Sequence, residues 1–264
     1  MDYTDLNGPR HDLAPASAPS RTVLVASTRR CGSTLLSGAL AGTGRCGVPH
    51  EYFNLEHMVP LRARGAPAHL RHYVHWLRQR RTTPNGVFSV KAHYRQLEDT
   101  FVHDKVDPRP LLAPLRAVWI RRRDRVRQAV SAARAAQTEQ WSKQQRSKAE
   151  PHYQYPLIAL LLQDIVRQEQ AWPVFFQRMG VTPVVVHYDA LSQAYAPTVR
   201  GVCAALGLGG DVTVVPPVRT RMSGGQSAAW ARRFRVEAAK RGIPSAWFGP
   251  QEPDDAPNRG RITT

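Results

Sequence analysis

The residues best suited to bind an anion follow the first apolar run of the chain. That run, TVLVAS from Thr22, leads directly into Ser-Thr-Arg-Arg-Cys-Gly-Ser-Thr, after which a helix is expected to begin. Backbone amides at a helix N-terminus, small residues, hydroxyl donors and adjacent guanidinium groups together suit a phosphate-like group. The sequence therefore predicts an anion-binding loop. Its members are Arg29, Arg30, Cys31, Gly32, Ser33 and Thr34.

The loop lacks the residues of two common nucleotide-binding motifs. A kinase-type Walker loop needs an upstream Gly and a Lys before the Ser or Thr, but here Gly32 is followed directly by Ser33. The GxGxxG pattern of dinucleotide-binding proteins is missing as well. A P-loop small-molecule kinase is therefore kept only as an alternative.

Three residues could serve acid–base or charge-stabilising chemistry. Glu51 stands in Pro-His-Glu-Tyr-Phe, and Lys91 and His93 lie at the end of the second apolar run. A carboxylate or an imidazole can accept the proton of a hydroxyl group, and an ammonium group can stabilise developing negative charge. From residue type alone, Glu51 could equally be a loop carboxylate paired with an arginine, and His93 a structural histidine.

The elements that must position these residues alternate between strands and helices. Four short β-branched runs, which begin at Thr22, Gly86, Arg116 and Thr182, are typical of buried strands in a parallel sheet. Helical patterns cover residues 34–40, 68–81, 125–137, 156–179, 198–206 and 227–240, with a kink expected at Pro173. This alternation predicts an α/β fold with a doubly wound, mainly parallel sheet flanked by helices, and ligands at the carboxyl ends of its strands.

Length and composition favour one main domain. The chain has 264 residues, of which 42% are hydrophobic, enough for a substantial core. Residues 1–20 and 249–264 are expected to be a flexible leader and tail around a domain at 21–248. The polar stretch from Gln137 to Tyr155 is expected to be an acceptor lid with Trp141 as its apolar anchor, or else a plain surface loop.

The charge and the cysteines limit the classes of partner. Lys and Arg number 37 against 20 Asp and Glu, giving a net charge of +17 that favours anionic partners. A non-catalytic nucleic-acid-binding protein is a second alternative, but the chain lacks helix-turn-helix, RNP and zinc motifs. Its three cysteines have no metal-ligand spacing, which predicts a reducing, cytoplasmic location and no metal. No apolar stretch is long enough for a membrane span, so no membrane partner is expected.

Several segments carry a resemblance to a known family. ASTRRCGSTLLSGAL and VPHEYF resemble the bacterial sulfotransferases of the trehalose 2-sulfotransferase type, and TPNGVFSVKAHY, RRRDRVRQAVS, HYDAL and SAAWARRFR match further segments in order. The resemblance implies a P-loop-like fold and transfer of the sulfuryl group of 3′-phosphoadenosine 5′-phosphosulfate (PAPS) to a small-molecule hydroxyl. The acceptor would be a carbohydrate, or a glycosylated or nucleoside-like product of secondary metabolism. Metal is not needed, and a homodimer is expected because family members often dimerise.

The resemblance also assigns donor-binding residues. It implies that the loop binds the 5′-phosphosulfate, with Cys31 in place of the family's usual Ser. An arginine that closes the third strand and a serine eight residues later bind the 3′-phosphate in sulfotransferases generally, and Arg123 and Ser131 have that spacing. The neighbouring Arg125 and Arg127 are expected at the surface.

The catalytic assignment follows from the same comparison. Glu51 matches the family's general base, and Lys91 is expected to stabilise the transferring group. His93 ranks second as base, because eukaryotic cytosolic sulfotransferases place a Lys-x-His at this strand end. The remaining expectation concerns acceptor contacts, which are assigned to Tyr52, Phe53 and Trp141.

Overall fold

The computed structural model describes residues 6–13, 19–102, 104–139, 149–217 and 225–252. The chain forms two compact units. The first comprises Met1–Arg122 and Arg167–Val218, and the second Arg123–Val166 and Arg219–Thr264.

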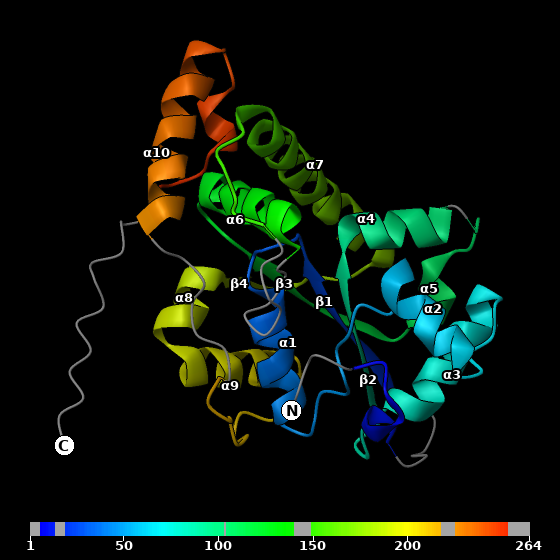
Figure 1. The fold of residues 1–264 in the computed structure, drawn as a ribbon. Coiled ribbons are helices and arrows are strands. Elements are labelled where there is room, and N and C mark those ends of the chain that lie inside the picture. Colours follow the sequence, from blue (N-terminus) through cyan, green and yellow to red (C-terminus); the bar gives the residue numbers. More distant parts are fainter. Residues whose placement is uncertain (1–5, 14–18, 103, 140–148, 218–224, 253–264) are drawn as a thin grey trace. The chain divides into compact units, whose positions relative to one another are not determined.

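A parallel sheet forms the centre of the first unit. Its strands are β1 (Arg21–Ser27), β2 (Val87–His93), β3 (Leu115–Arg121) and β4 (Val184–His187), in the order β2-β1-β3-β4 (Figure 1). The strands are nearly continuous apolar runs, as expected where both faces of a sheet are covered. The predicted α/β fold with a parallel sheet flanked by helices is confirmed, and all four predicted strands are present.

Side-chain alternation along the strands builds a separate core on each face of the sheet. Leu24 and Ala26 of β1 point into a core that contains Trp172 and Phe88, whereas Val23 and Val25 point into one that contains Val202. The helices of this unit are α1 (Ser33–Gly42), α2 (Leu55–Ala63), α3 (Leu70–Arg81), α4 (Tyr94–Leu97), α5 (Pro108–Leu112), α8 (Tyr188–Gln193) and α9 (Tyr195–Ala205), with a π-helix η3 (Glu98–Val102) and a 3₁₀ helix η2 (Pro9–His11).

The second unit is helical. It contains α6 (Arg125–Thr138), α10 (Gly225–Lys240), the 3₁₀ helix η4 (Ser245–Trp247) and the first part of α7 (Tyr155–Met179), whose later residues belong to the first unit. Fully buried Asp124 caps α6 by accepting the Arg127 amide at 2.8 Å. It also accepts from Arg235 at 2.7 Å and from the Glu252 amide at 2.9 Å, which fixes the chain after α10 against the start of α6.

Some segments differ from the expectations. Leu6 and His11 of the expected leader are buried, as is Glu252 of the expected tail, so parts of both make defined contacts. Arg127 is buried rather than at the surface, because its guanidinium pairs with Glu252 at 3.6 Å. Pro173 lies inside α7, and the kink stays a prediction.

Candidate active site

The predicted anion-binding loop lies between β1 and α1. Two of its residues adopt left-handed backbone conformations, Arg30 with φ 66° and Gly32 with φ 93°. Gly32 is the N-cap of α1, and its carbonyl accepts the Leu36 amide at 3.1 Å. A Cβ at Gly32 would collide with the Tyr188 ring, over which the Arg122 guanidinium lies at 5.3 Å from the ring centre. The loop therefore needs glycine at this position for both conformation and space.

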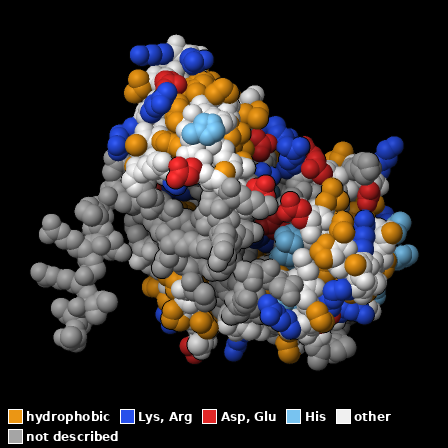
Figure 2. Space-filling model, viewed as in Figure 1, with side chains coloured by type: hydrophobic (Ala, Val, Ile, Leu, Met, Phe, Trp, Pro, Cys, Tyr) orange, Lys and Arg blue, Asp and Glu red, His pale blue; other side chains and the backbone are white. Residues whose placement is uncertain are grey.

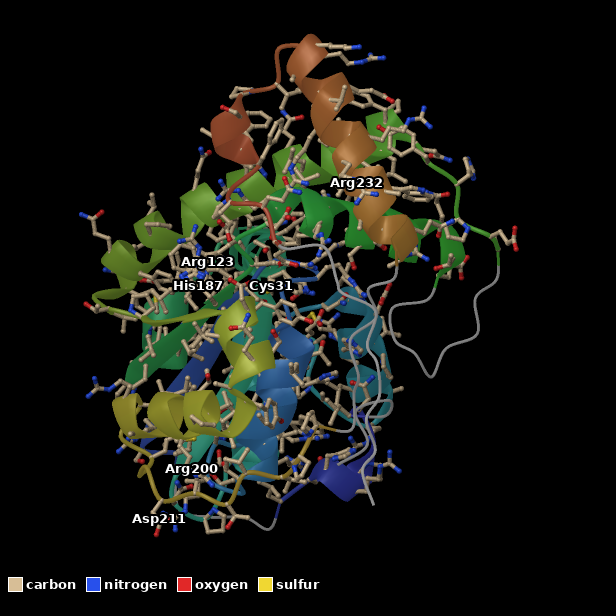
Figure 3. All side chains as sticks on the ribbon, turned by 90° about the vertical axis from the view of Figure 1, so that its left-hand side faces the viewer. Cys31, Arg123, His187, Arg200, Asp211 and Arg232 are labelled. Carbon is tan, nitrogen blue, oxygen red and sulfur yellow. The ribbon has the colours of Figure 1, made fainter. Side chains whose placement is uncertain are left out.

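Cys31 contributes its backbone to this loop, not a reactive thiol. The side chain is fully buried, and burial raises the pKa of the thiol to about 11, although the Thr28 and Ser33 amides act in the opposite direction. Figure 3 shows Cys31 and His187 at one end of the first unit, with Arg200 and Asp211 at the other. A neutral thiol can still be tolerated next to an anion, because it adds no negative charge.

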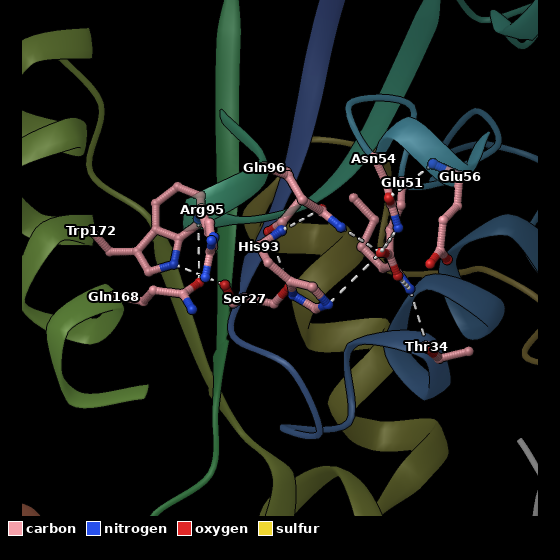
Figure 4. Close-up of polar contacts among 12 residues, drawn as sticks. Ser27, Thr34, Glu51, Asn54, Glu56, His93, Arg95, Gln96, Gln168 and Trp172 are labelled. Carbon is pink, nitrogen blue, oxygen red and sulfur yellow. Dashed lines mark hydrogen bonds and ion pairs between the residues drawn. The ribbon is translucent and has the colours of Figure 1, made fainter. Parts of the chain in front are cut away.

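Glu51 is the centre of a polar cluster beside this loop (Figure 4). Its Oε1 pairs with Lys91 Nζ at 2.6 Å, and its Oε2 accepts from Gln96 Nε2 at 2.6 Å. Asn54 Nδ2 lies 3.4 Å from the same Oε2. The structure thus holds the carboxylate by both oxygens.

Lys91 joins the carboxylate to the anion-binding loop. Its Nζ also donates to Thr34 Oγ1 at 3.2 Å, so one ammonium group is shared between Glu51 and the first turn of α1. The Lys91 side chain is 7% exposed and that of Glu51 is 17% exposed. A cation in this position is close to any anion held by the loop and to the group that could accept a proton.

Strand pairing explains how Glu51 reaches Lys91. His50 forms an isolated parallel bridge with Val90, and the Lys91 amide donates to the His50 carbonyl at 3.0 Å. Glu51 follows His50 directly and therefore lies at the carboxyl end of β2. This is the sheet edge at which ligands bind in open α/β folds.

His93 approaches the same carboxylate from the last position of β2. Its Nδ1 lies 2.9 Å from Ser27 Oγ, whose own proton is donated to the Ala92 carbonyl at 3.0 Å. The Ser27 hydroxyl must then accept from Nδ1–H, which leaves Nε2 facing Glu51 Oε2 at 3.8 Å. His93 is thus oriented toward the reacting region, at a distance too long for a direct hydrogen bond.

The surroundings of Glu51 keep it ionised. Burial alone would raise the pKa of this carboxyl, but the charge of Lys91, then that of His93, and hydrogen bonds from Lys91 and Gln96 outweigh it. The pKa of Glu51 lies well below its ordinary value as a result. At neutral pH the group can accept a proton but cannot donate one.

The other predicted site residues have different positions. Arg123 and Ser131 belong to the second unit. Arg123 is exposed and directly precedes Asp124, the N-cap of α6, whereas Ser131 lies within α6. Tyr52 and Phe53 are core residues: the Tyr52 hydroxyl donates to the Val48 carbonyl at 2.8 Å, and the Phe53 ring lies 5.0 Å from that of Phe101. The acceptor contacts expected of Tyr52 and Phe53 stay a prediction. Trp141 lies outside the described residues.

The sequence did not single out Gln96, although it connects the two candidate bases. Its Oε1 accepts the His93 amide at 2.9 Å while its Nε2 donates to Glu51. A Gln three residues after a strand end, at the start of a helix, is the one local pattern that could have indicated it. The three consecutive arginines at positions 121–123 do not share one environment. Arg121 pairs with Glu169 at 2.6 Å, and its guanidinium lies over the Trp119 ring.

The described part of the chain shows no group of three His, Cys, Asp or Glu side chains arranged to hold a metal ion. Within the same residues, no helix has both the length and the apolar character to cross a bilayer. On the face shown in Figure 2, the basic side chains of the described residues are interspersed with apolar and acidic ones.

The chain is similar to known proteins along most of its length. The sequence model of the Stf0 sulphotransferase family matches residues 22–237. A trehalose 2-sulfotransferase of Mycobacterium tuberculosis is 29% identical over 271 residues, which cover 85% of this chain and 98% of that protein. A trehalose 2-sulfotransferase of Mycolicibacterium smegmatis is 29% identical over 272 residues, covering 84% of this chain and 97% of the relative.

Proposed function

The chain belongs to the Stf0 sulphotransferase family, and from this premise we propose that it transfers the sulfuryl group of PAPS to a hydroxyl group of a small molecule. The observation that carries the proposal is the chain of contacts from Glu51 through Lys91 to Thr34. It joins a proton acceptor, a cation and an anion-binding loop at one sheet edge. In-line transfer of a sulfuryl group needs these three components.

The proposed donor contacts follow the family resemblance. The loop from Arg30 to Thr34 would bind the 5′-phosphosulfate through its backbone and hydroxyl groups. Arg123 and Ser131 would bind the 3′-phosphate, since a guanidinium can form paired hydrogen bonds to phosphate oxygens and a serine can add one more. PAPS is a substrate in this scheme, and no metal takes part.

The proposed reaction is a single displacement at sulfur. The acceptor hydroxyl gives its proton to Glu51 as its oxygen forms a bond to sulfur, and the bond between sulfur and the bridging oxygen of the donor breaks. The products are a sulfate ester and adenosine 3′,5′-bisphosphate. Lys91 stabilises the negative charge that develops on the sulfuryl group or on the leaving phosphate.

Shared use of Lys91 supports a defined order of events. While Lys91 holds Oε1 of Glu51, the carboxylate is a weak base because its pKa is low. An anion bound at the loop would compete for the same ammonium group, which also contacts Thr34. Donor binding would therefore make Glu51 a stronger base when the sulfuryl group is in place.

For the acceptor we propose a hydroxyl of a carbohydrate or of a glycosylated or nucleoside-like natural product. The support is that both relatives are named for sulfation of trehalose. A cytoplasmic location is proposed because Cys31, Cys46 and Cys203 are free thiols in the structure. A homodimer is proposed from the resemblance alone.

The proposal is tested by incubating the protein with PAPS and a set of hydroxylated metabolites that includes trehalose, and searching for the mass of a sulfate ester. Calorimetry with adenosine 3′,5′-bisphosphate, ATP and a random oligonucleotide accompanies the screen. We expect binding of the bisphosphate. Selective binding of ATP would instead favour a kinase, and selective binding of the oligonucleotide a nucleic-acid-binding protein.

A further inference from the structure

The segment that precedes β1 contacts the turn that carries Glu51. Leu6 and His11 are buried, with exposures of 3% and 6%, and His11 is the last residue of the 3₁₀ helix η2. The sequence of residues 1–20, rich in polar residues and without periodicity, predicts a flexible leader. The contacts of the described residues 6–13 give it a defined position instead.

Asn7 lies between two histidines of this turn and of the helix that follows it. Its Oδ1 is 3.1 Å from Nε2 of His50, and its Nδ2 is 3.1 Å from Nδ1 of His57. The centres of the two imidazole rings are 4.2 Å apart. One carboxamide therefore connects the residue next to Glu51 with α2.

The amide suits a pair of neutral imidazoles. In the observed orientation His50 donates its Nε2 proton to Oδ1, and the unprotonated Nδ1 of His57 accepts from the Asn7 amino group. Burial lowers the pKa of His50 well below its ordinary value and also lowers the pKa of His57. Both rings thus have the donor and acceptor pattern that an asparagine can satisfy and an alanine cannot.

A buried arginine fixes the segment from its other side. The Arg81 side chain, with no exposed surface, donates to the carbonyls of Leu6 at 3.0 Å and Gly8 at 3.2 Å. It pairs with Asp12 at 3.0 Å, which also accepts from Arg64 at 2.7 Å. Because an unpaired buried charge is costly, the segment and α3 stabilise each other.

From these contacts we infer that Asn7 is a positioning residue of the active site. It holds the His50 ring, and thereby keeps the His50 carbonyl on the Lys91 amide and the Glu51 carboxylate beside Lys91. The inference rests on the proposed function for its catalytic consequence. The N-terminal segment is then part of the functional enzyme, and Asn7 acts through its contact with His50.

The test compares Asn7→Ala with the matched control Pro9→Ala, which changes an exposed residue of the same segment. We expect Asn7→Ala to lower kcat roughly tenfold, because a small displacement of a catalytic group is enough for such a loss. Affinity for adenosine 3′,5′-bisphosphate should stay within about twofold of wild type, since the donor loop is untouched. Pro9→Ala should match wild type in both measurements.

Hydrogen exchange of the Lys91 amide supplies a readout that does not depend on activity. This amide donates to the His50 carbonyl, so it should exchange faster in Asn7→Ala, while the amides of β3 stay protected. An unchanged kcat, an unchanged Lys91 exchange rate, or a loss of kcat matched by an equal loss of nucleotide affinity would each overturn the inference. Were the wild-type protein to transfer no sulfuryl group, the proposed function would fail, and the exchange rate alone would still decide the positioning role.

A second variant covers the case in which Asn7→Ala does not fold. Asn7→Leu keeps the approximate volume of the side chain but removes both the oxygen that faces His50 and the amino group that faces His57. The same loss of kcat and the same faster exchange at Lys91 are expected. Retention of wild-type values in a folded Asn7→Leu protein would count against the amide bridge.

Discussion

Replacing Lys91 by methionine tests the contribution of the ion pair between Lys91 and Glu51. Met keeps most of the length and apolar volume of the lysine side chain but removes the ammonium group that lies 2.6 Å from Glu51 and 3.2 Å from Thr34. The carboxylate then stays largely buried and keeps its neutral donors, Gln96 and Asn54, with His93 Nε2 at 3.8 Å. The variant should therefore be less stable as well as inactive.

The size of the expected loss of stability follows from the burial of the ion pair between Lys91 and Glu51. Removing one partner of a buried ion pair costs about 3–5 kcal/mol when the other charge is left without compensation. A charge-assisted hydrogen bond such as that from Gln96 stabilises by about 1.5–3 kcal/mol and stays in place. Because the retained donors compensate part of the buried charge, we expect the free energy of unfolding of Lys91→Met to be lower than that of wild type by less than this full cost, about 2–3 kcal/mol at neutral pH.

The difference in the free energy of unfolding between wild type and Lys91→Met must also depend on pH, and the pKa of Glu51 determines the direction of that dependence. In wild type the pKa of Glu51 is lowered, so its contribution to stability is present above the ordinary carboxyl value of about 4.3 and is lost as the pH falls below it. In Lys91→Met the largest cause of lowering is gone and burial favours the neutral acid. The variant can relieve its buried charge by taking up a proton, so the gap in stability should narrow as the pH falls from neutral.

Urea unfolding near neutral pH and at about pH 5 measures both effects. Lys105→Met, a change of an exposed lysine, controls for the substitution itself. Adding Glu51→Gln to Lys91→Met should restore much of the stability at neutral pH and abolish the pH dependence of the gap. A gap that is the same at both pH values, or one that Glu51→Gln leaves unchanged, would refute this account of the pair.

Two further predictions concern the donor contacts. Gly32→Ala should weaken binding of adenosine 3′,5′-bisphosphate at least tenfold in calorimetry, because the added Cβ meets the Tyr188 ring. The control Gly44→Ala, also at positive φ but with open space around it, should leave the affinity near that of wild type. Equal effects of the two substitutions would mean that the loop is not the donor site. Arg123→Ala should remove the preference for PAPS over adenosine 5′-phosphosulfate, with a loss of about ten- to hundredfold in affinity, while the exposed Arg200→Ala should retain it. A preference that survives in Arg123→Ala would place the 3′-phosphate elsewhere.

The sheet could be predicted from sequence because its strands are short β-branched runs separated by helical periodicity. All four strands and the longer helices, such as α6 and α10, lie close to their predicted ranges. The short helices α2, α4, α5 and α8 were not predicted, since segments of four to nine residues carry little periodicity. Their positions depend on tertiary contacts.

The residues of the candidate site likewise include some that the sequence predicted and some that it did not. Glu51, Lys91 and His93 could be predicted because strand ends and a motif indicated them, and the structure brings their side chains together. Gln96 and Asn7 were not predicted, because each contacts a residue that is distant in sequence. The Tyr52 side chain lies in the core, although Glu51 directly precedes it in the sequence.

The most direct test of the central claim is the turnover of Glu51→Gln with PAPS and a confirmed acceptor. The substitution keeps the size of the side chain but removes the proton acceptor, so turnover should fall by about two to four orders of magnitude. Affinity for adenosine 3′,5′-bisphosphate should be retained, and the exposed control Glu56→Gln should behave as wild type. His93→Ala should cost less and act mainly on the acceptor KM. Near-normal turnover of Glu51→Gln beside an inactive His93→Ala would contradict the account and make His93 the base.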